Sequence, residues 1–222
     1  GNLCYSHIQV MPAPGSGRVM ASFADGMHFS GCKGSIEITD ARFKGLHDDP
    51  INIHGTHLEI TEKISPRKLK LRFMHHQTYG FSAFFAGDSI LFLHSAALQG
   101  YGLGRIAAAK LVSEREMEVT LDSDMPAGIR TGDCLENITW VPSVTIRNCR
   151  FEGVNTRGLL VTTRKKVVIE NNVFYRTGMH AILIADDASS WYESGPVQDV
   201  YIAGNVFEGC GYNLGVGNYV IA

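Results

Sequence analysis

The segment Ser143–Val161, SVTIRNCRFEGVNTRGLLV, recurs without gaps as Lys166–Ile184, KVVIENNVFYRTGMHAILI, and this recurrence indicates the fold. Two further copies share the pattern, SIEITDARFKGLHDDPINI at Ser35–Ile53 and DVYIAGNVFEGCGYNLGVG at Asp199–Gly217. Each copy reads as a short β-branched strand, an Asn or Asp turn, a Phe, a Gly corner and a second apolar strand. Self-similarity of this kind is the signature of a repeat architecture.

The spacing of the copies indicates which repeat architecture this is. The copies begin at residues 35, 143, 166 and 199, so the steps between them are 108, 23 and 33 residues. A unit near 23 residues is too short for a βαβ crossover, but it suits one rung of a parallel β-helix, whose rungs stack about 4.8 Å apart. We therefore predict an all-β fold based on a right-handed parallel β-helix.

Two columns of matched positions run through the four copies. One column is aromatic and is predicted to stack inside the helix: Phe43, Phe151, Phe174 and Phe207. The other column lies at the turn: Asp40, Asn148, Asn171 and Gly204. Asn and Asp tolerate the left-handed backbone conformation. A matched Asn at a turn also favours a ladder of side-chain hydrogen bonds along the stack.

The 108-residue step contains a large insertion at residues 61–141. It holds strand-like runs near residues 68–76, 88–94, 105–113 and 117–122, which predict a small antiparallel β-barrel or sandwich inserted into the helix. The expected domains are rungs at 1–60, the inserted barrel at 61–141 and further rungs at 142–222. Because an uncapped β-helix exposes strand edges at both ends, we expect the chain to be part of a longer protein.

Composition narrows the function classes. The 222 residues are 45% hydrophobic and 19% charged, with a formal net charge of -2. This is ordinary for a soluble globular protein, and there is no basic surplus that would favour nucleic-acid binding. No apolar run reaches the roughly 18 residues that predict a membrane span. The five cysteines are widely spaced and form no CxxC pair, so we expect no structural metal cluster.

Three aspartates mark the candidate site. The segment LHDDPINIHG, residues 46–55, is echoed one unit earlier by ADGMHFSG, residues 24–31. Depending on the alignment, Asp25 lies opposite Asp48 or Asp49, roughly 5–10 Å away. This range covers both geometries of glycoside hydrolysis by two carboxylates. The alternative is that these residues only cap turns, but two adjacent Asp residues repel and are costly unless they are functional or solvated.

Polar side chains near the aspartates point to hydroxyl recognition. Strand alternation sends Ile51 and Ile53 into the core and leaves the intervening residues facing outward. The outward residues are predicted to bind substrate: His28, Asn52 and His54. The rung-aligned positions downstream are also polar: Arg157, His180 and Asn213. A stripe of carboxylates, imidazoles, amides and a guanidinium along one face of a solenoid resembles a sugar-binding groove.

The ten-residue excess of the last step lies in DDASSWYESG, residues 186–195. Insertions of this kind map to loops, often on the binding face of a solenoid. An aromatic ring can stack on a sugar, and carboxylates can accept hydrogen bonds from its hydroxyls. The predicted substrate-binding residues of this loop are Asp186, Asp187, Trp191 and Glu193. The alternative is a surface loop whose aromatic residue packs back on the rung below.

The sequence offers little support for a metal ion. His54 and His57 are three residues apart and would point to opposite sides of a strand. Asp186 and Asp187 lack the spaced ligands of a calcium loop of the EF-hand type. We therefore predict neither a metal site nor a cofactor.

The run from Ala24 to Phe29, followed by Gly45–Thr56, GLHDDPINIHGT, resembles glycoside hydrolase family 110. These are exo-acting α-1,3-galactosidases, including enzymes that remove the terminal galactose of the blood group B antigen. The resemblance covers most of the chain: the rungs, the barrel insertion and the long loop after a late rung. Its most specific element is the spacing from Asp25 to Asp48 and Asp49.

The resemblance implies metal-independent hydrolysis with inversion at the anomeric carbon. Asp25, Asp48 and Asp49 match the catalytic aspartates of the family. Asp25 is then expected to be the general acid, while Asp48 and Asp49 hold and deprotonate the attacking water. The implied substrate is an oligosaccharide or glycoconjugate with terminal α-galactose, linear or of the branched blood group B type. The implied location is secreted, periplasmic or at the cell surface.

Two other functions remain open from the residues alone. Many right-handed β-helices are calcium-dependent polysaccharide lyases with an Arg or Lys base, and Arg157 on the candidate face is compatible with such a reaction. A β-helix can also bind glycans without turning them over, as in an adhesin or a tailspike. The three clustered aspartates argue against both.

Overall fold

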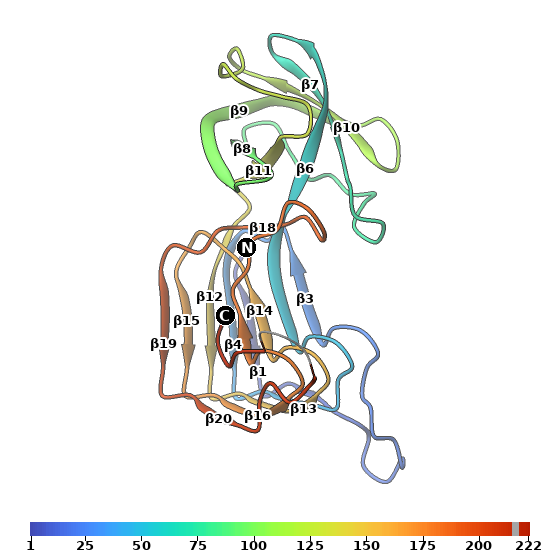
Figure 1. Cartoon of the computed structure of the whole chain (residues 1–222), viewed down its shortest axis with the longest axis vertical. Coiled ribbons are helices and arrows are strands. Elements are labelled where there is room, and N and C mark those ends of the chain that lie inside the picture. Colours follow the sequence, from blue (N-terminus) through green and yellow to red (C-terminus); the bar gives the residue numbers. More distant parts are fainter. Residues whose placement is uncertain (215–217) are drawn as a thin grey trace. The chain divides into compact units, whose positions relative to one another are not determined.

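The computed structural model describes residues 1–214 and 218–222, so the end of the fourth repeat copy, residues 215–217, lies outside the described residues. Every regular element of the described part is a β-strand. The chain divides into two compact units (Figure 1). Unit 1 comprises Gly1–His54, Pro142–Ala185 and Pro196–Ala222, and unit 2 comprises Gly55–Val141 and Asp186–Gly195.

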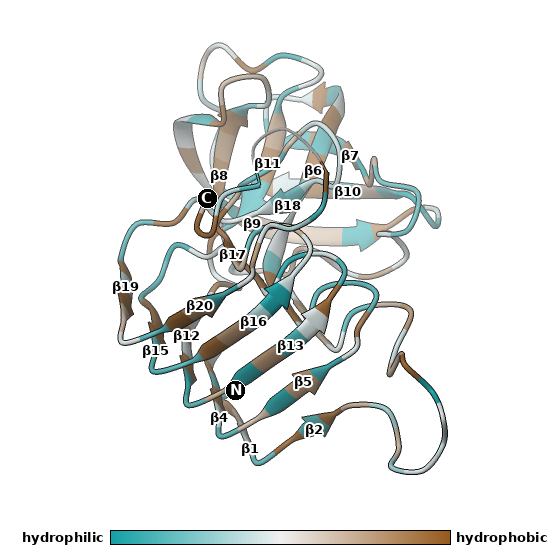
Figure 2. Cartoon of the chain, turned by 60° about the horizontal axis from the view of Figure 1, so that its bottom comes forward, coloured by the Kyte–Doolittle hydropathy of each residue, from teal (hydrophilic) through white to brown (hydrophobic). Residues whose placement is uncertain are grey.

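Unit 1 is a parallel β-helix with three sheets. The first sheet contains, in spatial order, β1 (Leu3–Ser6), β4 (Gly34–Thr39), β12 (Pro142–Arg147), β15 (Val167–Glu170) and β19 (Val200–Ala203). The second contains β2 (Gln9–Val10), β5 (Arg42–Lys44), β13 (Arg150–Val154), β16 (Val173–Thr177) and β20 (Val206–Glu208). The third contains β3 (Met27–Ser30), the start of β6 (Ile51–Ser65), β14 (Leu159–Val161) and β17 (Ile182–Leu183). Figure 2 shows the first two sheets as stacked rungs.

The strand register confirms the repeat. Ile36 pairs with Val144, Val144 with Val167 and Val167 with Val200, which reproduces the steps of 108, 23 and 33 residues. The structure adds one rung that the four copies did not include, because Leu3 of β1 pairs in parallel with Ile36. The echo around Asp25 therefore belongs to this first rung, whose third strand is β3.

The aromatic column stacks inside unit 1 as predicted. The ring centroids of Phe43 and Phe151 lie 5.3 Å apart, those of Phe151 and Phe174 4.8 Å, and those of Phe174 and Phe207 5.2 Å. The first three rings are fully buried. A rung spacing near 4.8 Å brings each ring face to face with the next, so one residue type repeated in register fills the core.

The turn column adopts the left-handed conformation, with φ of 53° at Asp40, 54° at Asn148 and 57° at Asn171. The prediction that these same residues form the hydrogen-bond ladder is wrong by one position. The buried amide of Asn172 donates from Nδ2 to Ile146 O at 3.0 Å and to Asn205 Oδ1 at 2.9 Å. Left-handed Asn148 and Asn171 are exposed to solvent, whereas the residue that follows each of them is buried.

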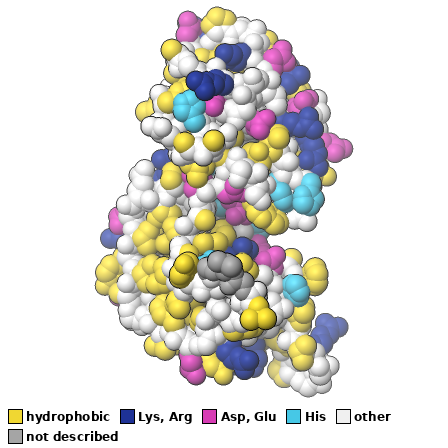
Figure 3. All heavy atoms as spheres, viewed as in Figure 1, with side chains coloured by type: hydrophobic (Ala, Val, Ile, Leu, Met, Phe, Trp, Pro, Cys, Tyr) yellow, Lys and Arg dark blue, Asp and Glu magenta, His cyan; other side chains and the backbone are white. Residues whose placement is uncertain are grey.

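The last rung of unit 1 leaves apolar side chains exposed. Figure 3 shows such side chains gathered on this face. Those with large exposed fractions include Val206 (55%) and Tyr201 (50%). Beyond the strands, Ile221 forms an isolated parallel bridge with Ile182.

Unit 2 is a closed antiparallel barrel. Its strands follow the order β6, β7 (Lys68–Arg72), β10 (Glu116–Leu121), β9 (Gln99–Leu111), β8 (Ser89–His94) and β11 (Cys134–Asn137). β11 then pairs with β6, from Cys134 opposite Glu59 to Glu136 opposite His57, which closes the sheet. The interior is apolar, with Phe73, Phe84 and Phe92 among the fully buried side chains. The short β18 (Glu193–Ser194) adds to β6.

These elements confirm the predicted fold class, a parallel β-helix with an inserted antiparallel barrel. In the described part of the chain, no helix is long and apolar enough to cross a bilayer.

Candidate active site

Strand register brings four candidate residues to one position of successive rungs. Ile51 of β6 pairs with Met27 of β3 on one side and with Leu159 of β14 on the other, and Leu159 pairs with Ile182. The residues two positions earlier therefore align, and we call them the site column: Asp25, Asp49, Arg157 and His180. This register decides the alignment that the sequence left open, because Asp25 lies opposite Asp49.

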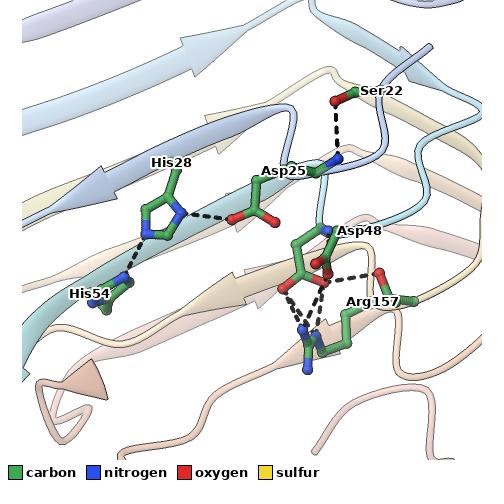
Figure 4. A network of polar contacts seen from close by, with 9 residues as sticks. Ser22, Asp25, His28, Asp48, His54 and Arg157 are labelled. Atoms are coloured by element: carbon green, nitrogen blue, oxygen red, sulfur yellow. Dashed lines mark hydrogen bonds and ion pairs between the residues drawn. The ribbon is translucent and has the colours of Figure 1, made fainter. Parts of the chain in front are cut away.

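The three aspartates form one cluster (Figure 4). Asp25, Asp48 and Asp49 each contribute a carboxylate oxygen, and these oxygens all lie within 4.8 Å of one another. Two of the residues are neighbours in the chain, and the third is brought to them by the pairing of β3 with β6. Carboxylates this close disfavour simultaneous ionisation, a condition suited to sharing protons. The same donor set could hold a cation.

Asp49 is the buried member of the cluster, with its side chain 1% exposed. Arg157 donates from Nε to Asp49 Oδ1 at 2.8 Å, its Nη2 lies 2.8 Å from Oδ2, and Thr156 Oγ1 donates to Oδ1 at 3.2 Å. Burial raises the pKa of Asp49 above its usual value, and the charges of Asp25 and Asp48 act in the same direction. Arg157 opposes this shift, both by hydrogen bonding and by its charge.

Asp48 is the open member of the cluster. Its side chain is 42% exposed, and Arg157 Nη2 lies 3.6 Å from its Oδ1. The same Oδ1 accepts a hydrogen bond from the backbone N–H of Asp49 at 3.0 Å. The Asp48 carboxylate is thus fixed in direction by its neighbour, yet it can contact water or a ligand.

Asp25 is connected to two histidines. Its Oδ2 lies 2.8 Å from His28 Nδ1, and His28 Nε2 lies 2.7 Å from His54 Nε2. One proton must lie between the two Nε2 atoms to make the second contact a hydrogen bond. This chain of contacts holds the Asp25 carboxyl group in one orientation and places a titratable group beside it (Figure 4).

Glycine at position 26 permits this arrangement. A Cβ atom there would lie 2.7 Å from Pro50 O and 2.9 Å from a methyl group of Leu46. Gly26 N donates to Asp49 O at 2.9 Å, and Met27 N donates to Pro50 O at 2.9 Å. The close approach of the two rungs at this glycine therefore sets the distance between Asp25 and the Asp48–Asp49 pair.

The other predicted residues of unit 1 fall into two groups. Asn52 and His54 are only 5% and 2% exposed, so both are buried and not open to solvent as expected. Ile51 and Ile53 take the core side of β6 as predicted. His180 ends the site column, where its Nδ1 lies 2.8 Å from Tyr219 O. Tyr219 thus follows His180 along the stack.

The prediction that Asn213 aligns with Arg157 and His180 in this column is wrong. Its side-chain Nδ2 donates to Asn155 O at 2.8 Å, and its backbone N–H donates to Gly178 O, also at 2.8 Å. The cause is the length of the last step. Ile182 pairs with Ile221, whereas the 33-residue step between the repeat copies predicted a partner six residues earlier. The chain therefore reaches the column position at Tyr219 and not at Asn213.

The loop residues belong to unit 2. Asp186 Oδ1 lies 2.8 Å from Nε2 of the fully buried His57. The Asp187 carboxylate caps its own loop by accepting hydrogen bonds from the backbone of Ser189 at 2.9 Å and from the backbone of Trp191. The Trp191 side chain is 48% exposed, and its ring centroid lies 4.2 Å from that of His75. Asp186 and Asp187 thus organise the loop, and Trp191 is its exposed aromatic residue.

Sequence reasoning missed Thr156, which donates to Asp49. The signal that could have found it is its position directly before Arg157, which the repeat had already aligned with the candidate face. Sequence reasoning also did not pair Arg157 with Asp49, since it considered Arg157 as a substrate-binding group or as the base of a lyase.

Comparisons with known proteins agree with both units. Residues 68–135 match the family model described as GLAA-B beta-barrel domain II, and residues 134–221 match the right-handed beta helix region. A solved bacteriophage AP22 tailspike in complex with Acinetobacter baumannii capsular saccharide covers 92% of this chain and 41% of its own, at 8% identity and a TM-score of 0.27. That likeness is too low to bear on fold or function.

Curated relatives match the chain over nearly all its length. Alpha-1,3-galactosidase A of Bacteroides fragilis is 50% identical over 222 residues, which is 100% of this chain and 37% of the relative. The protein of the same name from Bacteroides thetaiotaomicron is 51% identical over 95% of this chain and 37% of its own length. Alpha-1,3-galactosidase B of that organism is 40% identical over 93% of this chain and 33% of its own. The chain thus spans about a third of the length of these relatives, and the matches confirm the resemblance of its sequence to the alpha-1,3-galactosidases.

Proposed function

We propose that the protein containing this chain is an exo-acting α-galactosidase that hydrolyses terminal α-1,3-linked galactose from glycans. The observation that carries the proposal is the cluster of three carboxylates within 4.8 Å, built by two adjacent rungs. Glycoside hydrolysis needs one carboxyl group that gives a proton and one carboxylate that accepts one. The names of the relatives supply the substrate class.

In the proposed mechanism Asp25 is the general acid. Its protonated carboxyl group gives a proton to the glycosidic oxygen as the bond between that oxygen and the anomeric carbon breaks. A water oxygen bonds to the anomeric carbon from the opposite face. Asp48 takes the proton of this water, and the leaving sugar departs with a hydroxyl group. The cycle closes when Asp25 regains a proton and Asp48 loses one.

The surroundings of the aspartates support this division of roles. Asp48 has the exposed carboxylate, and its direction is fixed by the Asp49 backbone, so it is suited to contact the water. Asp49 is held by Arg157 and Thr156 and faces no open solvent, so we assign it to orienting the pair and setting its charge. His28 orients Asp25.

We further propose inversion at the anomeric carbon on the family resemblance alone, because carboxylate oxygens within 4.8 Å of one another are closer than the roughly 6.5–9.5 Å typical of inverting enzymes. A proton NMR time course on the full-length protein tests this directly, because inversion releases β-galactose first. Release of α-galactose first would contradict inversion while leaving galactose hydrolysis intact. The preference between linear and branched blood group B substrates is tested in the same assay with one glycan of each type. A secreted or cell-surface location is part of the proposal, since such glycans lie outside cells.

The two rival functions predict different products. A lyase base must be free to remove a proton, but Arg157 is engaged by Asp49 at 2.8 Å, which disfavours that function. Unsaturated products formed only with calcium would nevertheless establish a lyase. Saturable glycan binding without release of galactose would establish a binding module instead.

A further inference from the structure

An exposed aromatic side chain stands beside the carboxylate cluster and has no role in the mechanism above. Phe23 precedes Asp25 by two residues and is 77% exposed. Its ring stacks on that of His47, with centroids 4.6 Å apart and an interplanar angle of 25°. His47 in turn directly precedes Asp48. The stacked pair therefore joins the same two segments that supply the three aspartates.

The exposure of Phe23 is not that of a loose loop. Ala21 N donates to Gly45 O at 2.7 Å, and His47 N donates to Ser22 O at 3.0 Å. On the other side of Phe23, the backbone N–H of Ala24 donates to Ser22 Oγ at 3.3 Å. The backbone is thus tied down both before and after the ring.

The chain before Phe23 also packs so closely against Gly45 that only glycine fits at that position. Gly45 has a φ of 64°, and a Cβ there would lie 2.5 Å from Val19 O. The segment before Phe23 therefore lies directly over Gly45. A rigid backbone that presents an aromatic ring to solvent, with one face backed by an imidazole, has the form of a stacking platform.

We propose that Phe23, supported by His47, is the stacking platform for the sugar that leaves in the reaction. This inference rests on the proposed function, because it takes Asp25 as the group that protonates the glycosidic oxygen. Phe23 and Asp25 are two residues apart, so their backbones are separated by at most about 7 Å, roughly the length of a pyranose ring with its linking oxygen. A ring that close to the general acid meets the sugar on the leaving side of the bond.

The test compares two substrates in the full-length protein. One is a disaccharide of galactose linked α-1,3 to galactose, and the other is α-galactosyl fluoride, which has no leaving sugar. Phe23→Ala is expected to lower kcat/KM for the disaccharide by roughly threefold to tenfold, the range for loss of one aromatic contact. It should leave kcat/KM for the fluoride unchanged, because no ring remains to stack.

Further variants separate stacking from general apolar contact. Phe23→Trp should keep activity on the disaccharide, whereas Phe23→Leu should lose as much as Phe23→Ala, because leucine has no flat ring. His47→Ala should produce a smaller loss through a less well-held Phe23. Tyr201→Ala is the matched control, an exposed aromatic residue on β19 that should affect neither substrate.

The outcomes that overturn the inference are distinct from failure of the proposed function. An equal loss on both substrates, full recovery with leucine, or no loss at all would each remove Phe23 as the leaving-sugar platform. A clear drop in Tm for Phe23→Ala would also overturn it, since that would show a structural role. If the unaltered protein releases galactose from neither substrate, the proposed function fails, and the inference fails with it.

Discussion

Two columns of matched positions run through the stacked rungs of unit 1 and differ in one respect. The aromatic column repeats one residue type, Phe43, Phe151, Phe174 and Phe207. The site column changes at nearly every step, from Asp25 and Asp49 to Arg157 and His180. Both columns use the same register of parallel strands, so the difference lies in the side chains. Repetition builds the core of the helix, and departure from repetition builds a chemical site.

The physical reason is the short distance between rungs. Identical aromatic rings about 4.8 Å apart attract each other, whereas identical charges at that spacing repel. The site column keeps like charges adjacent only once, at Asp25 and Asp49, and Arg157 follows immediately with a guanidinium that contacts Asp49. The one place where repulsion is retained is the place to which we assign the chemistry.

The largest expected effect comes from replacing a carboxyl group of the cluster by an amide. Asp25→Asn, Asp48→Asn and Asp49→Asn should each lower kcat by about a hundredfold to ten-thousandfold in the full-length protein, because a general acid or base is lost or displaced. Circular dichroism should show an intact fold. Asp40→Asn is the matched control, since other rungs carry Asn at this turn position and activity should persist. Near-normal galactose release from any cluster variant would exclude that residue from the mechanism.

The next effect concerns the aromatic column. Phe151→Ala should lower the free energy of unfolding by about 3–5 kcal/mol, because it leaves a cavity between two stacked rings in a fully buried site. Denaturant titration measures this loss, and kcat of the folded fraction should remain close to normal. If Phe151→Ala kept its stability but lost turnover, the aromatic column would have a role in catalysis and not only in the core.

A smaller effect is expected from Arg157, through the pKa of Asp49. Arg157→Gln removes the groups that oppose the upward shift of this pKa, so the protonated form of Asp49 persists to higher pH. The proposed reaction needs Asp48 and Asp49 in their ionised forms. The acidic limb of the pH profile of kcat/KM should therefore move to higher pH. Arg157→Lys, which keeps the charge but loses the two-point contact, should move it less. An unchanged acidic limb would show that Asp49 does not set the activity at low pH.

The smallest expected effect is that of metal removal. Asp49 has a guanidinium as its counter-charge, so the proposed reaction assigns no step to a cation. Dialysis against EDTA should leave galactose release unchanged, and added calcium should not raise it. Loss of activity on chelation with recovery on calcium would instead place a cation at the three carboxylates.

Much of this arrangement could be predicted from the repeat. Matched Phe and turn residues set the rungs, and the echo of Asp48–Asp49 at Asp25 predicted that three carboxylates would meet. The turn ladder could not be placed correctly, because Asn171 and Asn172 look equivalent in sequence, and only the left-handed backbone decides which one faces inward. Asn213 was misplaced because a repeat predicts register only where the length of the step is known.

The repeat pattern was enough to predict the β-helix, the inserted barrel and the meeting of three aspartates, because side chains at matched positions of stacked rungs must be neighbours. The folded chain was needed to show that Asp25 lies opposite Asp49, that Asp49 is buried against Arg157 and Thr156, and that Asp48 remains open. Burial and ion pairing depend on how several rungs close around one side chain. No single repeat encodes that environment, so it could not be inferred from the repeat.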